Sequence, residues 1–215
     1  MAPKLHKMDY SPPCRFVYLT AEALGIKLDY SEIDLKKLDQ LDPAFLKLNP
    51  QHTIPTLEDD GKVIWDSHAI SVYLFTKYAK DDSLYPKDLY KRAVVDQRFH
   101  FNSGTVFYLL RHIVRLMKYK GVKTISQELI DESIQAYEFL EKFLDGHQWI
   151  AGDQLTLADF CLLTSTTSLD VLVPINASKF PNVTAWIKRG QQLPYYHVNQ
   201  KGLDDFRNVI KTLLA

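Results

Sequence analysis

The chain has 215 residues, of which 46% are hydrophobic and 24% charged, and 26 Lys and Arg balance 26 Asp and Glu. This composition excludes a disordered or fibrous chain, and the lack of net positive charge argues against a nucleic-acid binder that works by counterion release. We also expect no membrane association, because no apolar run approaches the ~20 residues that span a bilayer.

The cysteine content and the amino terminus both favour a cytoplasmic protein. Cys14 and Cys161 are too few for a disulfide framework, and they form no metal site with neighbouring residues, so no metal is expected. The first seven residues, Met-Ala-Pro-Lys-Leu-His-Lys, contain no apolar segment typical of a secretion signal.

The first 80 residues contain short segments separated by turn residues. A weak strand is expected at Leu5–Met8, ahead of a helix that Pro12-Pro13 begin and Gly25 ends. A second strand is expected at Leu28–Asp34, although polar and apolar residues alternate poorly there. Asp42-Pro43 then begin a short helix, because Asp is a favoured N-cap and proline fits the first helical position.

A β-hairpin follows in the prediction. Its strands are expected within Thr53–Glu58 and Lys62–Trp65, and Asp59-Asp60-Gly61 form the turn. Asp66-Ser67 then cap a helix that runs to about Ala79. The resulting order, βαβαββα, is that of a thioredoxin-like domain, which we place at residues 1–80.

The rest of the chain predicts a second domain of helices only. Residues 81–88 are polar with one proline and are expected to be a linker to an all-α domain at residues 89–215. Further helices are expected at about residues 156–171, 181–189 and 203–213. Two apolar stripes at helical spacing support the prediction: Val106, Leu109, Leu110, Ile113 and Met117, and Ile130, Ile134, Tyr137, Leu140 and Leu144.

Ser11 and Cys14 lie at the start of the first predicted helix. A thioredoxin-like domain often carries a Cys-x-x-Cys redox pair there, because the helix N-terminus stabilises a thiolate. With Ser11 at the first position, no intramolecular disulfide can form with Cys14. Ser11 either donates a hydrogen bond to the thiolate of a ligand or serves only as the N-cap. Cys14 is expected to be a small buried hydrophobe.

The segment Gln51-His52-Thr53-Ile54-Pro55 is the second candidate for function. A cis peptide bond before Pro55 would leave the backbone of Ile54 free to pair with an extended, peptide-like ligand. The alternative is a trans proline at a strand start, with His52 as an ordinary surface residue.

Asp66 and Ser67 form the third candidate. A helix N-terminus with a serine can bind a carboxylate, and Asp66 beside it can bind an ammonium group, so the pair would suit an amino-acid head group. The alternative is a simple helix cap. Arg111, within an apolar helical stretch, either reaches into a cleft or extends along the surface. Thr156 and Asp159 have the spacing of a capping box, for which we expect a structural role.

In this order the motifs resemble those of the cytosolic glutathione transferases, most closely the insect epsilon class and next the delta class. The resemblance extends from about residue 8 to about residue 205 and implies a glutathione-binding thioredoxin-like domain followed by a helical domain that forms most of the electrophile pocket. It rests on the strings Ser11-Pro12-Pro13-Cys14-Arg15, Asn49–Pro55, Asp66–Ile70, Asp82–Asp88, Leu155–Phe160 and Leu193–Tyr196.

The resemblance implies a role for each matching residue. Ser11 matches the catalytic serine of the family. The residues expected to bind glutathione are His52, Thr53, Ile54, Pro55, Asp66, Ser67 and Arg111. Those expected to line the electrophile pocket are Leu35, Phe107, Leu110, Arg111, Val114 and Phe206. Two positions depart from the family pattern: Gln40 stands where epsilon members often have a histidine, and the first strand, Lys4–Met8, is unusually polar.

The activity that the resemblance implies is detoxification by conjugation of glutathione to hydrophobic electrophiles, with dehydrohalogenation, peroxide reduction and insecticide resistance as related roles. Glutathione is a co-substrate, so no separate cofactor is expected, and the likeness implies a homodimer. Two alternatives stay open: a non-catalytic binding protein with this fold, and a glutaredoxin-like thiol transferase that uses Cys14.

Overall fold

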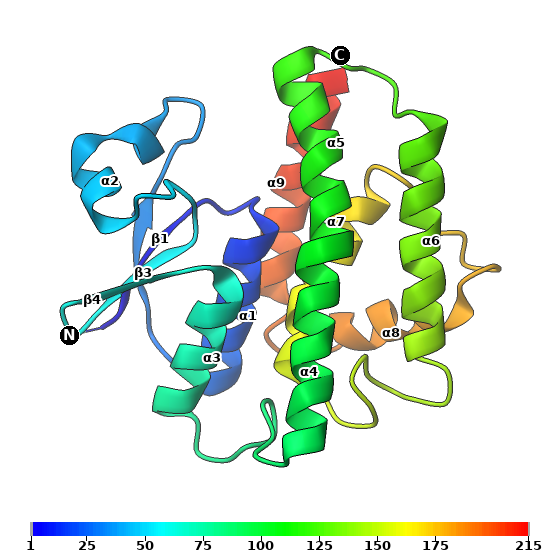
Figure 1. Ribbon diagram of the computed structural model, residues 1–215, viewed down its shortest axis with the longest axis horizontal. Helices are drawn as coiled ribbons and strands as arrows, with labels where there is room; N and C mark the ends of the chain where they lie inside the picture. Colours follow the sequence, from blue (N-terminus) through cyan, green and yellow to red (C-terminus); the bar gives the residue numbers. More distant parts are fainter. Residues whose placement is uncertain (1, 215) are drawn as a thin grey trace.

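The computed structural model describes residues 2–214, in which a small sheet with flanking helices lies beside a larger group of helices (Figure 1). The predicted βαβαββα order is confirmed for the first part of the chain. Its elements are β1 (Lys4–Lys7), α1 (Pro12–Leu24), β2 (Asp29–Glu32), the 3-10 helix η1 (Asp39–Leu41), α2 (Pro43–Leu48), β3 (Thr56–Asp59), β4 (Lys62–Trp65) and α3 (Ser67–Tyr78).

The sheet has the strand order β2-β1-β3-β4, with β1 parallel to β2 and antiparallel to β3. Its register pairs His6 with Thr56, and Thr56 in turn with Trp65. The end of β1, the start of β3 and the end of β4 therefore lie at one edge of the sheet. Three segments meet at this edge. They are the loop from β1 to α1, the segment before β3 and the connection from β4 to α3.

Two polar residues of β1, His6 and Lys7, are buried next to acidic side chains. His6 is 5% exposed, and its Nε2 lies 2.7 Å from Oε1 of Glu58 on β3. Lys7 is 6% exposed; its Nζ donates to Asp9 at 2.6 Å and also contacts the Glu32 carboxylate. Buried charges require such partners, so neighbouring acids account for a strand that is polar for its position.

The second part of the chain is all helical, as predicted. It contains α4 (Leu89–Phe101), the π-helical turn η2 (Asn102–Val106), α5 (Phe107–Lys120), α6 (Gln127–Phe143), α7 (Leu157–Asp170), α8 (Pro181–Gln191) and α9 (His197–Leu214). In Figure 1, α4 and α5 follow each other as one long rod. Within residues 2–214, no helix combines the length and the apolar character needed to cross a membrane.

The last helix begins at His197, whereas the apolar pattern placed its start near Leu203. The apolar pattern does not indicate the start of α9, because its first turns are mostly polar and contain Gly202. Gly202 allows the helix to pack closely, because a Cβ there would collide with the carbonyl oxygen of Asp9 and lie 2.6 Å from Cδ of Arg15.

Helix α7 runs through the core of the helical domain, and every residue from Leu157 to Leu169 is buried. The capping box at its start is confirmed, since the side chains of Thr156 and Asp159 each bond to the backbone of the other. Helix α1 packs against α3, α7 and α9, so it lies between the sheet and the helical domain. This position places the N-terminus of α1 beside both domains.

Candidate functional site

Ser11 occupies the N-cap position of α1 but does not act as a capping side chain. Its backbone is extended (φ −75°, ψ 118°), and its hydroxyl makes no capping hydrogen bond. The first two helical positions are Pro12 and Pro13, which have no N–H groups. Ser11 is therefore the N-cap of α1 by position and backbone conformation, but its hydroxyl forms no capping hydrogen bond.

Cys14 is fully buried, as expected from the sequence. Burial raises the pKa of its thiol to about 11, although hydrogen bonding with Ser11 acts in the opposite direction. A thiol with this pKa is protonated at neutral pH, and the thiolate is the reactive form. Cys14 is therefore an unreactive residue of the core.

Arg15 is a buried cation that the sequence analysis did not single out. Its guanidinium donates to Oδ1 of Asn199 on α9 and to Oγ of Ser168 on α7, both at 2.5 Å. Burial lowers its pKa to about 10, so it remains charged at neutral pH. Among residues 2–214 it has no carboxylate partner within 4 Å. Its side chain joins α1 to the helical domain one turn beyond Ser11.

The segment before β3 contains a cis peptide bond between Ile54 and Pro55, which confirms that alternative. Buried Asn49 holds the segment, because its Nδ2 donates to the carbonyl of Thr53 at 3.0 Å and to Oγ1 of Thr56 at 2.9 Å. Within the described part of the chain, the N–H and C=O of Ile54 make no backbone hydrogen bond. These groups are free to pair with an extended ligand. His52, in the same segment, is exposed with a φ of 46°.

Asp66 is the N-cap of α3, with a φ of 73°. Its Oδ1 accepts from the backbone N–H groups of His68 at 2.8 Å and Ala69 at 3.2 Å. Partial loss of solvent around its carboxylate would raise the pKa of Asp66, but hydrogen bonds from His68 and Ala69 outweigh this effect and hold the pKa below its ordinary value. Asp66 is thus an exposed carboxylate that is charged at neutral pH, next to the buried Ser67.

His68 connects this site to the helical domain and was missed in the sequence analysis. Its Nδ1 lies 3.2 Å from Oδ1 of Asp66, and its Nε2 lies 3.3 Å from Nδ2 of Asn102 in η2. Its ring also contacts Phe16 and Phe99, with centroid distances of 5.6 and 5.0 Å. The sequence motif Asp-Ser-His could have indicated His68, but its partner, Asn102, is too distant in sequence to identify.

The residues expected to line an apolar pocket differ in exposure. Phe107 and Val114 are half-buried on α5, and Leu35 is half-buried in the loop after β2. Leu110 and Phe206 are 2% and 4% exposed and belong to the core of the helical domain. Arg111 is exposed on α5, and Gln40, in η1, has a buried Oε1 with no hydrogen-bond partner in residues 2–214.

The arrangement can bind a peptide-like molecule across one edge of the sheet. The sheet register brings the Ser11 loop, the Ile54–Pro55 segment and the start of α3 to that edge. These segments offer a hydroxyl, unpaired backbone groups and a carboxylate beside a helix N-terminus. Ile54 would pair with the middle of the ligand, and Asp66 would bind an ammonium group at one end.

Comparison with known proteins gives matches over both domains. The family model "Glutathione S-transferase, N-terminal domain" matches residues 5–82, and "Glutathione S-transferase, C-terminal domain" matches residues 103–194. Glutathione S-transferase 1 of Manduca sexta is 41% identical over 218 residues, which cover 100% of both chains.

Solved structures with similar folds are also insect proteins. Glutathione Transferase E6 from Drosophila melanogaster has a TM-score of 0.95 and 48% identity, covering 99% of this chain and 97% of its own. An epsilon-class glutathione S-transferase from the housefly, Musca domestica, has a TM-score of 0.96 and 46% identity over 98% of both chains. A glutathione transferase homolog described with bound glutathione has a TM-score of 0.96 and 48% identity, over 98% of this chain and 97% of its own.

Proposed function

The chain belongs to the glutathione S-transferase family, and from this premise we propose that Ser11 activates the thiol of glutathione for attack on hydrophobic electrophiles. The observation that carries the proposal is the Ser11 hydroxyl, which lies at a helix N-terminus and makes no capping hydrogen bond. Ser11 is buried and hydrogen-bonds with the Cys14 thiol rather than with the helix backbone, so its hydroxyl would turn from that thiol to donate to the thiolate of the ligand.

The energy required for this activation is small. A free thiol has a pKa of about 8.5. Lowering this pKa by about two units requires about 2.7 kcal/mol of stabilisation of the thiolate relative to the thiol. One hydrogen bond to a charged acceptor contributes roughly 1.5–3 kcal/mol. The dipole of α1 adds about 0.3–1 kcal/mol. Ser11 and its helix are therefore sufficient.

The other candidate residues would hold glutathione in an extended form. The Ile54 backbone would pair with its cysteinyl unit, and Asp66 with Ser67 would bind the γ-glutamyl ammonium and carboxylate groups. His52 and Thr53 would lie near the glycine end, and Arg111 would lie at the top of the electrophile pocket. The bound glutathione of one structural relative supports this ligand.

The wider role that we propose is detoxification in the cytoplasm by a homodimer, with glutathione as co-substrate and no separate cofactor. Conjugation would be the main reaction, with dehydrohalogenation or peroxide reduction as side activities. A thiol transferase that uses Cys14 is disfavoured, because this thiol is fully buried and its pKa is raised to about 11.

We expect the purified protein to conjugate a chlorodinitrobenzene in the presence of glutathione and to leave it unchanged in its absence. A Cys14→Ser variant should retain most of this activity, because the thiol is protonated and takes no part in the reaction. A modest loss of stability is expected from the buried hydroxyl. Absorbance of the conjugate measures the rate.

Two results would contradict this expectation. No conjugation by the wild-type protein would favour a non-catalytic binding protein. Loss of activity in a Cys14→Ser variant that remains folded and binds glutathione would assign the reaction to Cys14.

The γ-glutamyl site gives a further prediction. An Asp66→Ala/Ser67→Ala variant should show a KM for glutathione raised by about tenfold or more, because a charged ammonium and a carboxylate both lose partners. Its KM for the electrophile should change little. Initial rates over both substrates test this, with exposed Asp60→Ala, in the turn at the opposite end of β4, as the control for removal of a carboxylate outside the site. A larger change for the electrophile than for glutathione would mean that the two pockets are assigned the wrong way round.

A further inference from the structure

Positive charge is concentrated in one stretch of this otherwise neutral chain. Residues 97–127 contain no Asp or Glu but six Lys or Arg, whereas acidic and basic residues are equal in number over the whole sequence. Four of the six are on α5: Arg111, Arg115, Lys118 and Lys120. The helix therefore carries a local positive field that is not balanced along its own length.

These four side chains are exposed and available to a ligand. Within residues 2–214, none of them lies within 4 Å of a carboxylate, whereas Lys77 and Lys179 elsewhere have acidic partners at 2.6 and 2.8 Å. A cation without an internal partner can bind an anion without first breaking an ion pair.

Aromatic rings accompany the cations on α5. Tyr119 is 64% exposed, and its ring centroid lies 5.7 Å from Cζ of Arg115 and 5.1 Å from Nζ of Lys118. Tyr108 stacks on His112 with a centroid distance of 5.9 Å and an interplanar angle of 10°. The spacing 108, 112, 115 and 119 places these residues along one strip of the helix surface. Such a strip presents flat rings and positive charge together.

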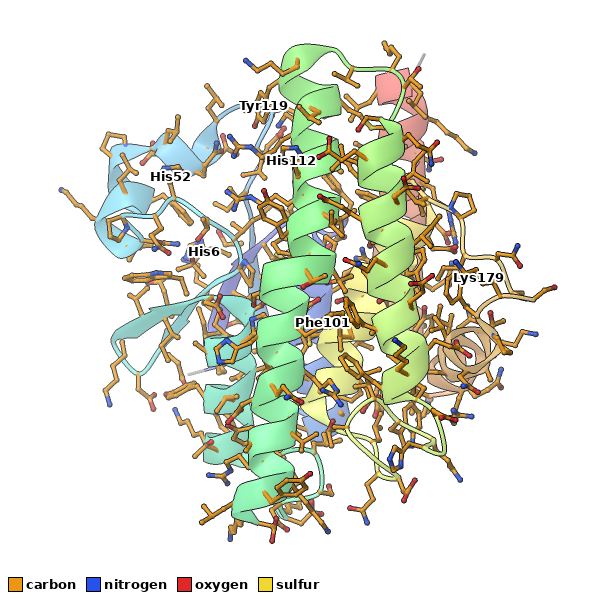
Figure 2. All side chains as sticks on the ribbon, turned by 45° about the vertical axis from the view of Figure 1, so that its right-hand side comes forward. His6, His52, Phe101, His112, Tyr119 and Lys179 are labelled. Carbon is orange, nitrogen blue, oxygen red and sulfur yellow. The ribbon has the colours of Figure 1, made fainter. Side chains whose placement is uncertain are left out.

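The end of this strip faces the segment that carries Ser11. Tyr10, directly before Ser11, packs against the helical-domain core, and burial together with nearby Asp34 and Tyr119 raises the pKa of its hydroxyl. Figure 2 shows Tyr119 near the top of α5 and His112 below it, both on the side nearer α2 and His52. The carboxylate of Asp34, which also acts on Tyr10, lies 4.0 Å from Nζ of Lys37.

We propose that the electrophile pocket prefers aromatic electrophiles that carry a carboxylate or sulfonate, whose charge is bound by Arg115 and Lys118 and whose ring lies against Tyr119. This rests on the proposed transferase function and specifies its substrate class. In the test reaction, the thiolate sulfur bonds to the ring carbon that carries chlorine. Chloride leaves with the bonding electrons, and the thiol proton passes to solvent.

The test compares two electrophiles that differ at one ring substituent, which is a charged carboxylate in 4-chloro-3,5-dinitrobenzoate and a neutral ester in its methyl ester. Each kcat/KM is divided by the uncatalysed rate constant with glutathione, which corrects for the reactivity of the ring. At low ionic strength we expect this ratio to favour the carboxylate by about tenfold, and salt should reduce the preference because exposed charges are screened. An Arg115→Gln/Lys118→Gln variant should lose most of the preference.

A Lys80→Gln/Lys188→Gln variant is the matched control, because it removes the same charge from two exposed lysines outside α5. It should keep the preference, and both variants should keep their activity toward the ester. Equal ratios for the two electrophiles in the wild type, or an unchanged preference in the Arg115→Gln/Lys118→Gln variant, would overturn the inference. Turnover of the ester would in that case still support the transferase function. Failure of both electrophiles to react would reject the function, and the inference with it.

Discussion

A Ser11→Ala variant is expected to lose about one to three orders of magnitude in turnover with glutathione and a chlorodinitrobenzene, while its affinity for glutathione changes little. The reason is that the hydroxyl would stabilise the thiolate, whose charge matters for the reaction more than for binding of the ground state. Titration of the bound thiol by its ultraviolet absorbance should show a raised pKa in the variant. The rate should accordingly recover in part at higher pH.

The control for this variant is Ser11→Thr, which keeps a hydroxyl at the same position and should retain more activity than Ser11→Ala. Helix stability should be similar in all three proteins, because the Ser11 side chain makes no capping hydrogen bond. Unchanged turnover and an unchanged thiol pKa in Ser11→Ala would show that another group activates glutathione.

The second large effect is expected at Asp159, where an Asn substitution should lower the free energy of unfolding by about 3–5 kcal/mol. The carboxylate is fully buried, and its Oδ1 accepts from the N–H of Ile150 at 2.8 Å and from Nε1 of Trp186 at 3.0 Å. Its Oδ2 accepts from the N–H and the hydroxyl of Thr156, at 2.8 and 3.1 Å. An amide can offer only one oxygen, so its NH₂ group would face two donors.

Thermal and denaturant unfolding measure this loss, which corresponds to a fall in Tm of about 6–20 °C for a chain of this length. The exposed Asp145→Asn variant, which removes a carboxylate from the preceding loop, should unfold like the wild type. A loss below about 1 kcal/mol at Asp159 would contradict the hydrogen-bonding argument.

The pH dependence of stability provides a second measurement on the same residue. Burial raises the pKa of Asp159 from its ordinary value of 3.8 to about 6, against four hydrogen bonds that lower it. Because the folded state then binds this proton more tightly than the unfolded state, its contribution to stability falls as the pH rises from about 4 to about 6. The Asp159→Asn variant should lack this part of the pH profile.

Features that depend on neighbours along the chain could be predicted from the amino-acid sequence. Capping involves residues within one turn of each other, so helix starts can be recognised locally. Examples are Asp42-Pro43, Asp66-Ser67 and the Thr156–Asp159 capping box. Apolar residues at helical spacing identified α5 and α6 in the same way, since a helix buries one side. The serine in place of a cysteine at position 11 excluded dithiol chemistry without knowledge of the fold.

The tertiary structure decided every feature that depends on residues distant in sequence. Arg15 is charged and looks like a surface residue, but it is buried because Ser168 and Asn199, more than 150 positions away, accept its hydrogen bonds. His68 meets Asn102 for the same reason, and Gly202 of α9 lies so close to the Asp9 carbonyl that a Cβ would collide with it. Such pairings follow from how helices pack, and no spacing along the chain encodes them, so only the folded structure reveals them.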